Sequence, residues 1–195
     1  MAMSPRALRP AQAARRDEIV AAAAEVLRTQ GVGACTARSI AAASPLTKSA
    51  IHYYFSDVDQ IVDEAFRQLM EAYLARIERA AASAVVPTPA WWAAAHAYLS
   101  FGVDRGDRIP LLWFDYQVHR ARKGGSATSA ELTDRTIELF VRLVAATGVD
   151  HPEDRARALF AALVGEIVLA SMRAIDVDRT LGELARSIGL PFTEP

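Results

Sequence analysis

Apolar residues recur at helical spacing from the first well-patterned segment of the chain, RRDEIVAAAAEVLRTQG. Acidic residues stand in its first turn, where the helix dipole favours them, and Gly31 is well placed to end a helix. The spacing places five apolar side chains on one face, namely Ile19, Ala22, Ala23, Val26 and Leu27. The pattern therefore predicts an amphipathic helix that ends at Gly31.

Two short helices are predicted next. Thr36 can cap the first, and Ser44-Pro45 must stop it because proline disfavours helical geometry in the residue before it. A second short helix, roughly Thr47 to Tyr53, follows within a few residues. Two short helices joined by so tight a turn form a helix-turn-helix, in which the second helix can be presented to a DNA groove.

The longest amphipathic run begins after Ser56, which we expect to open a capping box with Asp59. Nothing breaks the pattern before Pro87-Thr88-Pro89, so we predict one helix over about 57–84. At ~1.5 Å per residue it would be roughly 40 Å long and would act as a stiff link. Its apolar face consists of Ile61, Val62, Ala65, Phe66, Leu69, Tyr73 and Ile77.

Four or five further helices are predicted beyond Pro89. A capping box at Thr128 and Glu131 marks the start of one of them. Strand-like alternation is absent from the sequence, and alanine-rich blocks with few glycines favour helices throughout. The predicted fold class is therefore all-α, with the later helices at about 90–103, 110–122, 128–147, 152–175 and 179–188.

The composition narrows the class of protein. The single cysteine, Cys35, excludes an intramolecular disulfide, and the four scattered histidines leave no zinc-type spacing. We therefore expect no metal and no cofactor, and a reducing, cytoplasmic setting. The longest nearly uncharged run, AWWAAAHAYLSFGV, is too short to span a bilayer, so no membrane association is expected.

Charge is distributed unevenly along a chain whose net charge is −1. Residues 1–56 carry seven Lys or Arg and three Asp or Glu, which gives +4. Residues 57–195 carry fifteen basic and twenty acidic side chains, which gives −5. The first 16 residues contain arginines and no acid, and we interpret them as a flexible basic arm.

Residues 16–61 resemble the DNA-binding head of TetR-type transcriptional regulators. The resemblance implies a three-helix helix-turn-helix domain over 1–56, with the motif at about 36–55, followed by an effector-binding and dimerisation domain over 57–195. This chain has Pro45, His52 and Val58 where the family usually has glycine, tyrosine and lysine. The residues that carry the resemblance are Arg16, Ile19, Val20, Ala22, Ala23, Leu27, Gly31, Val32, Thr36, Ile40, Ala41, Thr47, Ile51, Tyr54, Phe55 and Ile61.

The helix predicted after Pro45 carries most of the candidate DNA contacts. Side chains in its first turn can reach base edges, and free backbone N–H groups there attract phosphate. His52 and Tyr53 face outward if Ile51 and Phe55 face inward. Capping alone would explain Thr36, and Tyr54 could instead pack under the first helix. The predicted DNA-binding residues are Thr36, Arg38, Thr47, Lys48, Ser49, His52, Tyr53 and Tyr54.

Aromatic residues concentrate in two neighbouring helices of the later part, at 91–101 and 111–119. Mostly apolar pockets with a few polar groups suit small-molecule binding, as the resemblance also implies. The alternative is that these large side chains simply fill the core of an alanine-rich bundle. The predicted ligand-binding residues are Trp92, His96, Trp113, Tyr116, Gln117 and Phe140.

The segment ARALFAALVGEIVLASMRA is apolar nearly all the way round. One face can enter the domain core, and the other needs a partner, for which a second copy of the chain is the simplest choice. The resemblance likewise implies a four-helix seam completed by the last helix. The predicted dimer contacts are Phe160, Val164, Val168, Met172, Leu181, Leu184 and Ile188.

The sequence thus favours a homodimeric regulator, by analogy a repressor, that binds a palindromic double-stranded DNA operator and is released by an unidentified small molecule. The rival hypothesis is a helical small-molecule-binding protein whose head has lost operator affinity. An enzyme is a distant third. Asp134 and Glu138 share a helix face, but such a pair is far more often solvated surface than an acid/base couple, and no nucleophile elbow or phosphate loop occurs.

Overall fold

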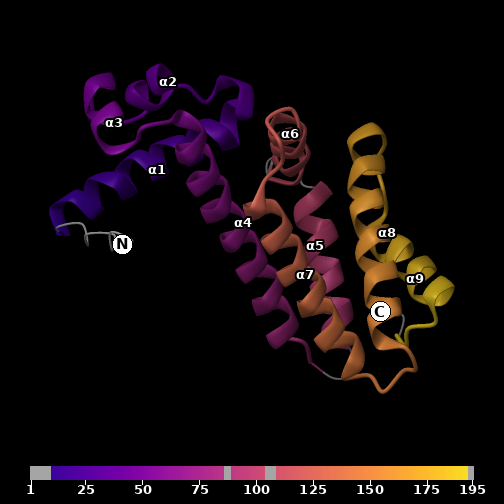
Figure 1. Ribbon diagram of the computed structural model, residues 1–195. Helices are drawn as coiled ribbons and strands as arrows, with labels where there is room; N and C mark the ends of the chain where they lie inside the picture. Colours follow the sequence, from indigo (N-terminus) through magenta and orange to yellow (C-terminus); the bar gives the residue numbers. More distant parts are fainter. Residues whose placement is uncertain (1–9, 86–88, 104–108, 193–195) are drawn as a thin grey trace. The chain divides into compact units, whose positions relative to one another are not determined.

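The computed structural model describes residues 10–85, 89–103 and 109–192. Within these ranges the chain forms nine α-helices, one short 3-10 helix and no strand (Figure 1). The predicted all-α fold class is confirmed. The chain divides into two units, of which the first ends at Leu69 and the second begins at Met70.

The first unit is a small bundle of short helices. Its elements are α1 (Pro10–Gln30), the 3-10 helix η1 (Val32–Ala34), α2 (Ala37–Ala42), α3 (Lys48–Tyr54) and the first turns of α4 (Val58–Ala82). Each element contributes apolar side chains from one face, as the periodicity predicts. The residues with 1% or less of their surface exposed are Ile19, Ala23, Val26, Leu27, Ile40, Ile51, Phe55, Ile61, Ala65 and Phe66.

Helix α1 begins earlier than its apolar pattern predicts. Residues 10–16 were expected to belong to a flexible arm, and the structure shows them as helix instead. The reason is local, because proline suits the first turn of a helix and the alanines and glutamine that follow are good helix formers. The rest of the expected arm, residues 1–9, lies outside the described residues.

Helix α4 begins at Val58, and its cap differs from the predicted one. The carboxylate of Asp57, rather than the hydroxyl of Ser56, accepts a hydrogen bond from the Asp59 backbone N–H, at 3.0 Å. A carboxylate so placed also interacts favourably with the positive end of the helix dipole. The helix then continues without a break from the first unit into the second.

The second unit contains the rest of α4 and five more helices. These are α5 (Ala90–Val103), α6 (Ile109–Ala121), α7 (Ala127–Ala145), α8 (Pro152–Met172) and α9 (Val177–Ile188). Helix α8 packs against α5, α7 and α9, and α5 and α7 lie side by side in Figure 1. The core residues with no exposed surface include Trp91, Leu99, Tyr116, Phe140, Leu159, Leu163 and Leu181.

Caps fix the ends of these helices one or two residues from the predicted places. Ser126, not Thr128, caps α7, because its hydroxyl accepts the Ser129 backbone N–H at 3.3 Å. Asp176 caps α9, so α9 starts at Val177 instead of Arg179. Arg155, at the start of α8, donates to the carbonyl oxygens of Ile188 and Gly189 and so fastens the end of α9.

Helix α8 stops at Met172, three residues short of the predicted end. None of the helices in the described ranges combines the length and the hydropathy that a bilayer crossing requires. The same residues hold no cluster of three or more His, Cys, Asp or Glu side chains that could bind a metal ion.

Candidate nucleic-acid interface and ligand cavity

Helices α2 and α3 are each fixed at the N-terminus by a threonine. The Thr36 hydroxyl accepts the Ser39 backbone N–H at 3.2 Å, and the Ser39 hydroxyl accepts the Thr36 backbone N–H at 2.9 Å. The Thr47 hydroxyl accepts the Ala50 backbone N–H at 3.2 Å. These bonds, reciprocal at Thr36, satisfy backbone N–H groups that have no partner in the first turn of a helix. They explain why two such short segments fold as helices. A DNA contact by either threonine stays a prediction.

Helix α3 has a buried side and an exposed side. Ile51 and the following Phe55 are buried, as expected, and this turns the opposite side outward. Tyr54 is half-buried, and its ring meets that of Tyr53 edge to face, with centroids 5.1 Å apart. The exposed residues on and beside α3 are Thr47, Lys48, Ser49, His52 and Tyr53, the last with 74% of its surface exposed.

Arg16 clamps the end of α3 against α1 and α4. Its guanidinium donates to the Tyr54 carbonyl oxygen at 3.1 Å and pairs with the Glu64 carboxylate at 2.5 Å. The same group lies 4.0 Å from the centre of the Phe55 ring, in a cation–π arrangement. The sequence identified Arg16 only through the family resemblance, because its partners are 38 and 48 residues away.

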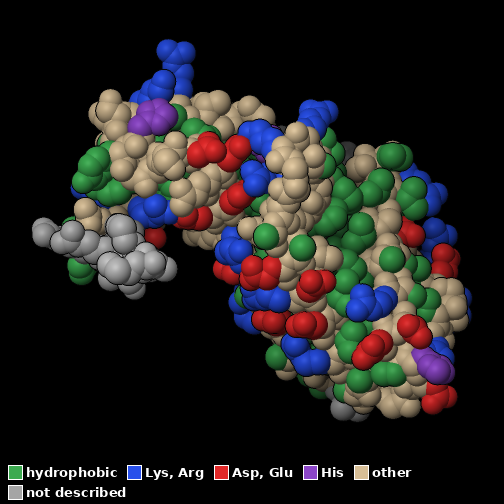
Figure 2. All heavy atoms as spheres, viewed as in Figure 1, with side chains coloured by type: hydrophobic (Ala, Val, Ile, Leu, Met, Phe, Trp, Pro, Cys, Tyr) green, Lys and Arg blue, Asp and Glu red, His purple; other side chains and the backbone are tan. Residues whose placement is uncertain are grey.

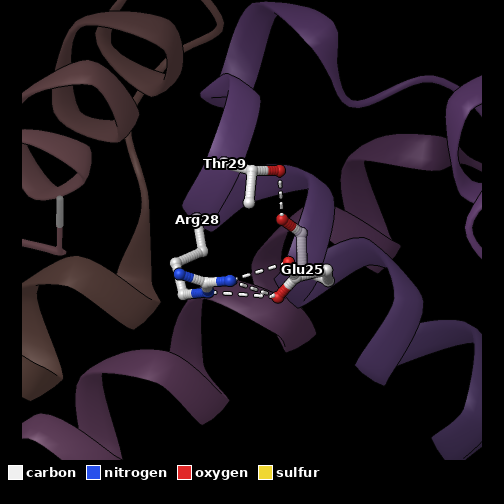
Figure 3. Close-up of polar contacts among 3 residues, drawn as sticks. All are labelled: Glu25, Arg28 and Thr29. Atoms are coloured by element: carbon white, nitrogen blue, oxygen red, sulfur yellow. Dashed lines mark hydrogen bonds and ion pairs between the residues drawn. The ribbon is translucent and has the colours of Figure 1, made fainter. Parts of the chain in front are cut away.

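Three of the five cations in residues 10–56, namely Arg15, Arg16 and Arg28, are already paired with acids. At the end of α1, Arg28 contacts both oxygens of Glu25, and the neighbouring Thr29 hydroxyl donates to the Glu25 carbonyl at 2.7 Å (Figure 3). Arg15 pairs with Glu18 at 2.6 Å, and the hydrogen bond between them raises the pKa of Arg15. These arginines are therefore partly neutralised before any partner arrives.

Arg38 and Lys48 differ from the other cations in residues 10–56. Both are exposed, and no ion pair or hydrogen bond of either side chain is recorded among the described residues. Arg38 lies on α2 and Lys48 opens α3, so both belong to the helix-turn-helix. The available positive charge is therefore concentrated on the surface where DNA contacts are predicted.

Cys35, between η1 and α2, is buried and takes no part in this surface. Burial raises the pKa of its thiol to about 11, because an apolar environment disfavours the thiolate. The residue is therefore a small apolar filler rather than a nucleophile at neutral pH.

The second unit contains a cavity of about 50 Å³. Helices α4, α5, α6, α7 and α8 all contribute to its wall, so the cavity lies among most of the helices of the unit. The lining residues are Met70, Tyr73, Leu74, Ile77, Tyr98, Ile109, Trp113, Phe114, Leu132, Thr133, Thr136, Phe160, Val164 and Ile167.

Trp113 is the predicted ligand-binding residue that lines this cavity. Phe140 lies behind the wall, with its ring centre 6.2 Å from that of Tyr98 and 6.4 Å from that of Phe160. Trp92 is outside the lining and stacks on Phe192 with ring centres 5.1 Å apart. The aromatic residues thus divide between a core role and a cavity role, as the two readings of the sequence allowed.

The polar members of the predicted set also lie outside the lining. The Tyr116 hydroxyl is 2.8 Å from that of Ser126, and the Gln117 amide donates to the Ser129 hydroxyl, so both hold α6 against the start of α7. His96 lies 3.2 Å from the Ser100 hydroxyl and 3.4 Å from the Asp178 carboxylate. A ligand contact by these three residues stays a prediction.

Several lining residues were outside the predicted ligand set. Tyr73 was assigned to the apolar face of the long helix, and its hydroxyl donates to the Tyr98 carbonyl at 2.7 Å. Thr133 and Thr136 carry no sequence signal that distinguishes them from ordinary helix residues. Burial raises the pKa of Tyr98, because the phenolate form is disfavoured away from water.

The predicted dimer contacts occupy three environments. Leu181 has no exposed surface within one chain and packs in its core. Phe160 and Val164 are half-buried and line the cavity, and their contact with a second copy stays a prediction. Val168, Leu184 and Ile188 are half-buried and Met172 is 77% exposed. The helical period places residues on one stripe, but the neighbouring helices decide which stripe faces outward.

The first unit is similar in sequence to a known protein family. Residues 19–65 match the family model described as bacterial regulatory proteins, tetR family. The first unit is therefore similar to the N-terminal domain of that family. The matched range begins in α1 and ends in α4, so it includes the helix-turn-helix described above. No curated protein matches the chain.

The whole chain also has the fold of TetR-family transcriptional regulators. A TetR-family regulator from Cytophaga hutchinsonii superposes with a TM-score of 0.72 at 14% identity, covering 94% of this chain and 97% of the other. A putative TetR-family regulator from Rhodococcus sp. gives 0.70 at 16% identity, with 93% and 100% covered. RolR in complex with resorcinol gives 0.65 at 13% identity, with 92% and 90% covered.

Proposed function

We propose that the protein is a ligand-responsive transcriptional regulator that binds a palindromic DNA operator as a dimer, and that it acts as a repressor. The observation that carries the proposal is the pair of unpaired cations, Arg38 and Lys48, on a helix-turn-helix that also exposes hydroxyl-bearing and aromatic side chains. Lys48 would contact phosphate or a base edge from the first turn of α3. Arg38 would hold the backbone from α2.

The proposed contacts need two heads acting together. Tight DNA binding with strong salt dependence typically involves about six to ten phosphate contacts. One first unit offers two unpaired cations over residues 10–56, together with hydroxyl groups and backbone N–H groups. A dimer doubles this supply and engages two half-sites about 34 to 36 Å apart.

We assign the dimer contact to the outer face of α8. Figure 2 shows hydrophobic side chains gathered on the second unit, where α5 and α8 lie. Leu169 is 38% exposed and Met172 77% exposed, although both are large and apolar. Small residues at helical spacing continue this face and would let a second helix approach closely, namely Ala158, Ala161 and Gly165.

Release by an effector would act through α4. The second half of this helix supplies Met70, Tyr73, Leu74 and Ile77 to the cavity wall, and its first turns carry Glu64, which holds Arg16. A ligand that shifts the helix would therefore change the support of α3. Coupling of ~1 to 3 kcal/mol is typical of allosteric proteins and changes affinity about 5- to 150-fold.

Selection of DNA from a random pool, followed by mobility shift, tests operator binding. We expect Lys48→Ala to weaken the selected complex and to lower the slope of log affinity against log salt by about 2, roughly one for each protomer. Arg28→Ala is the matched control, since Arg28 is an exposed cation that Glu25 already holds. Equal weakening by the two variants would contradict the assignment of Lys48.

Charge reversal on α8 tests the dimer. Met172→Arg together with Leu169→Arg should produce monomers and lose operator affinity, measured by light scattering and mobility shift. Val118→Arg, which changes a 52% exposed apolar residue on α6, should stay dimeric. A monomeric variant that bound the operator as tightly as the unaltered protein would contradict the proposal.

The second candidate function is a small-molecule-binding protein without operator affinity. Pro45 in the turn and Val58 at the start of α4 favour it, because they replace the glycine and lysine usual in the resembling regulators. Under this alternative, selection at low salt yields no preferred DNA sequence while ligand binding by the second unit is retained.

A further inference from the structure

The cavity of the second unit has no charge in its wall. Of the fourteen described residues that line it, none is Asp, Glu, Lys, Arg or His. Five are aromatic and most of the others aliphatic. An ionised ligand placed there would lose its hydration without gaining a counter-ion, which is strongly unfavourable.

The polar groups in the wall differ in whether they have partners. The Tyr73 hydroxyl donates to the Tyr98 carbonyl at 2.7 Å, and the Thr136 hydroxyl donates to the Leu132 carbonyl at 2.8 Å. For the hydroxyls of Tyr98 and Thr133, no hydrogen bond is recorded among the described residues. Both residues are half-buried, so these two hydroxyls can form a hydrogen bond with a guest in the cavity.

The Tyr98 hydroxyl is suited to donate a hydrogen bond to a neutral acceptor. Burial raises its pKa, so the phenol stays protonated throughout the neutral range. Trp113 and Phe114 from α6 and Phe160 from α8 supply aromatic surface to the same cavity. Flat rings pack well against such surfaces, edge to face or offset.

The size of the cavity limits the guest. One water needs about 10 to 15 Å³ of such space, so 50 Å³ corresponds to about three to five waters. Each water occupies about 30 Å³ in the liquid, which gives a molecule of about 100 to 150 Å³. That is the size of one ring with small substituents.

We propose that this cavity binds an uncharged, single-ring aromatic compound with a hydrogen-bond acceptor, seated between Tyr98 and Trp113. The inference rests on the proposed function only in making this compound the effector. The binding itself requires no DNA, so the two claims can fail separately.

Three compounds of nearly equal shape test the charge preference. Benzamide is uncharged, benzoate is its anionic counterpart and benzamidinium its cationic one, and phenol is a second neutral probe. Titration followed by calorimetry and by tryptophan fluorescence should show binding of a neutral probe, with each ion at least about 10-fold weaker. Binding of either ion as tight as that of benzamide, or no neutral binding at millimolar concentration, would overturn the proposal.

Two variants test the location. Tyr98→Phe keeps the ring but removes the hydroxyl. It should lower the affinity for the neutral probe by about 2- to 10-fold, which corresponds to the loss of one hydrogen bond. Tyr53→Phe removes an exposed hydroxyl of the first unit and should leave binding unchanged. Val164→Phe should fill the cavity and abolish binding in a protein that still melts cooperatively. Unchanged binding in Tyr98→Phe or in Val164→Phe would overturn the assigned seat.

Operator complexes separate this inference from the proposed function. A neutral probe that binds with the expected preference but leaves the operator complex intact would refute effector release and support the cavity assignment. An ion that dissociates the complex through the cavity would support effector release and overturn the charge preference.

Discussion

The two units place their polar chemistry on opposite sides of their helices. In the first unit, the residues available to a partner stand on the exposed side of α2 and α3, and the apolar side chains point inward. In the second unit, Tyr98 and Thr133, whose hydroxyls have no recorded hydrogen bond among the described residues, line a cavity, while the α8 surface exposes apolar residues such as Met172. A surface that binds a polyanion needs polar groups in water, whereas a cavity for a small molecule needs them sparse and enclosed.

The two units also differ in how their sites are assembled. The first unit's surface comes from one continuous segment, residues 36–54, whose side-chain directions are set by two threonine caps and two buried anchors. The cavity takes residues from five helices. Disruption of one anchor should therefore abolish the first site, while single changes should only tune the second.

The largest expected effect is that of Phe55→Ala. Phe55 is 1% exposed and lies under the Arg16 guanidinium, so its truncation should destabilise the first unit by about 3 to 5 kcal/mol. Chemical denaturation should show an earlier transition, and operator binding should be lost while the cavity still binds its probe. Loss of probe binding as well would show that the two sites do not separate as the comparison requires.

Removal of the clamp should have a smaller effect. Arg16→Ala loses the bonds to Tyr54 and Glu64, and we expect about 1 to 2 kcal/mol of destabilisation measured by urea unfolding. The adjacent Arg15 is the matched control, because its pair with Glu18 is exposed and screened by solvent, so Arg15→Ala should destabilise the protein less than Arg16→Ala. If a double-mutant cycle of Arg16 with Glu64 showed no coupling energy, the pair would not stabilise the unit and the interpretation of Arg16 as a clamp would be wrong.

A methyl group at Gly102 should perturb the cavity with a net stability change of about 1 kcal/mol or less. A Cβ there would lie 2.7 Å from Cγ1 of Ile167, a cavity-lining residue, and the resulting strain is partly offset by the better helix propensity of alanine. Gly102→Ala should therefore weaken probe binding more than it lowers the melting temperature. Gly165→Ala adds the same group in open space on α8 and should leave probe binding unaltered.

The smallest expected effect on stability near neutral pH concerns Cys35. Burial raises its thiol pKa from 9.0 to about 11, so less of the thiol is ionised in the folded state than in the unfolded state. A reagent that attacks the thiolate should therefore react more slowly with the folded protein. This difference in pKa stabilises the folded state at pH values below the pKa of the unfolded thiol. The stabilisation is lost as the pH rises through about 11. At pH 8 a disulfide reagent should react about 100-fold more slowly with native than with unfolded protein. Equal rates would indicate that the segment opens readily.

The helix-turn-helix and its exposed residues could be predicted from the sequence because their determinants are local. Thr36 and Thr47 cap within three residues, and the burial of Ile51 fixes the direction of Lys48 and Tyr53 within one turn. The clamp by Arg16 escaped prediction as a contact, because a spacing of 48 residues to Glu64 leaves no periodic trace.

The chain by itself determined the all-helical class, the order of the helices and the outward face of α3, since helical period and capping act between residues a few positions apart. Only the tertiary structure decided that Tyr98 and Thr133 line a cavity, that Leu181 is buried and that Phe160 faces inward. An apolar stripe along a helix indicates that this face is packed against something, but it does not indicate which helix or chain packs against it. That depends on how helices far apart in the sequence pack against one another.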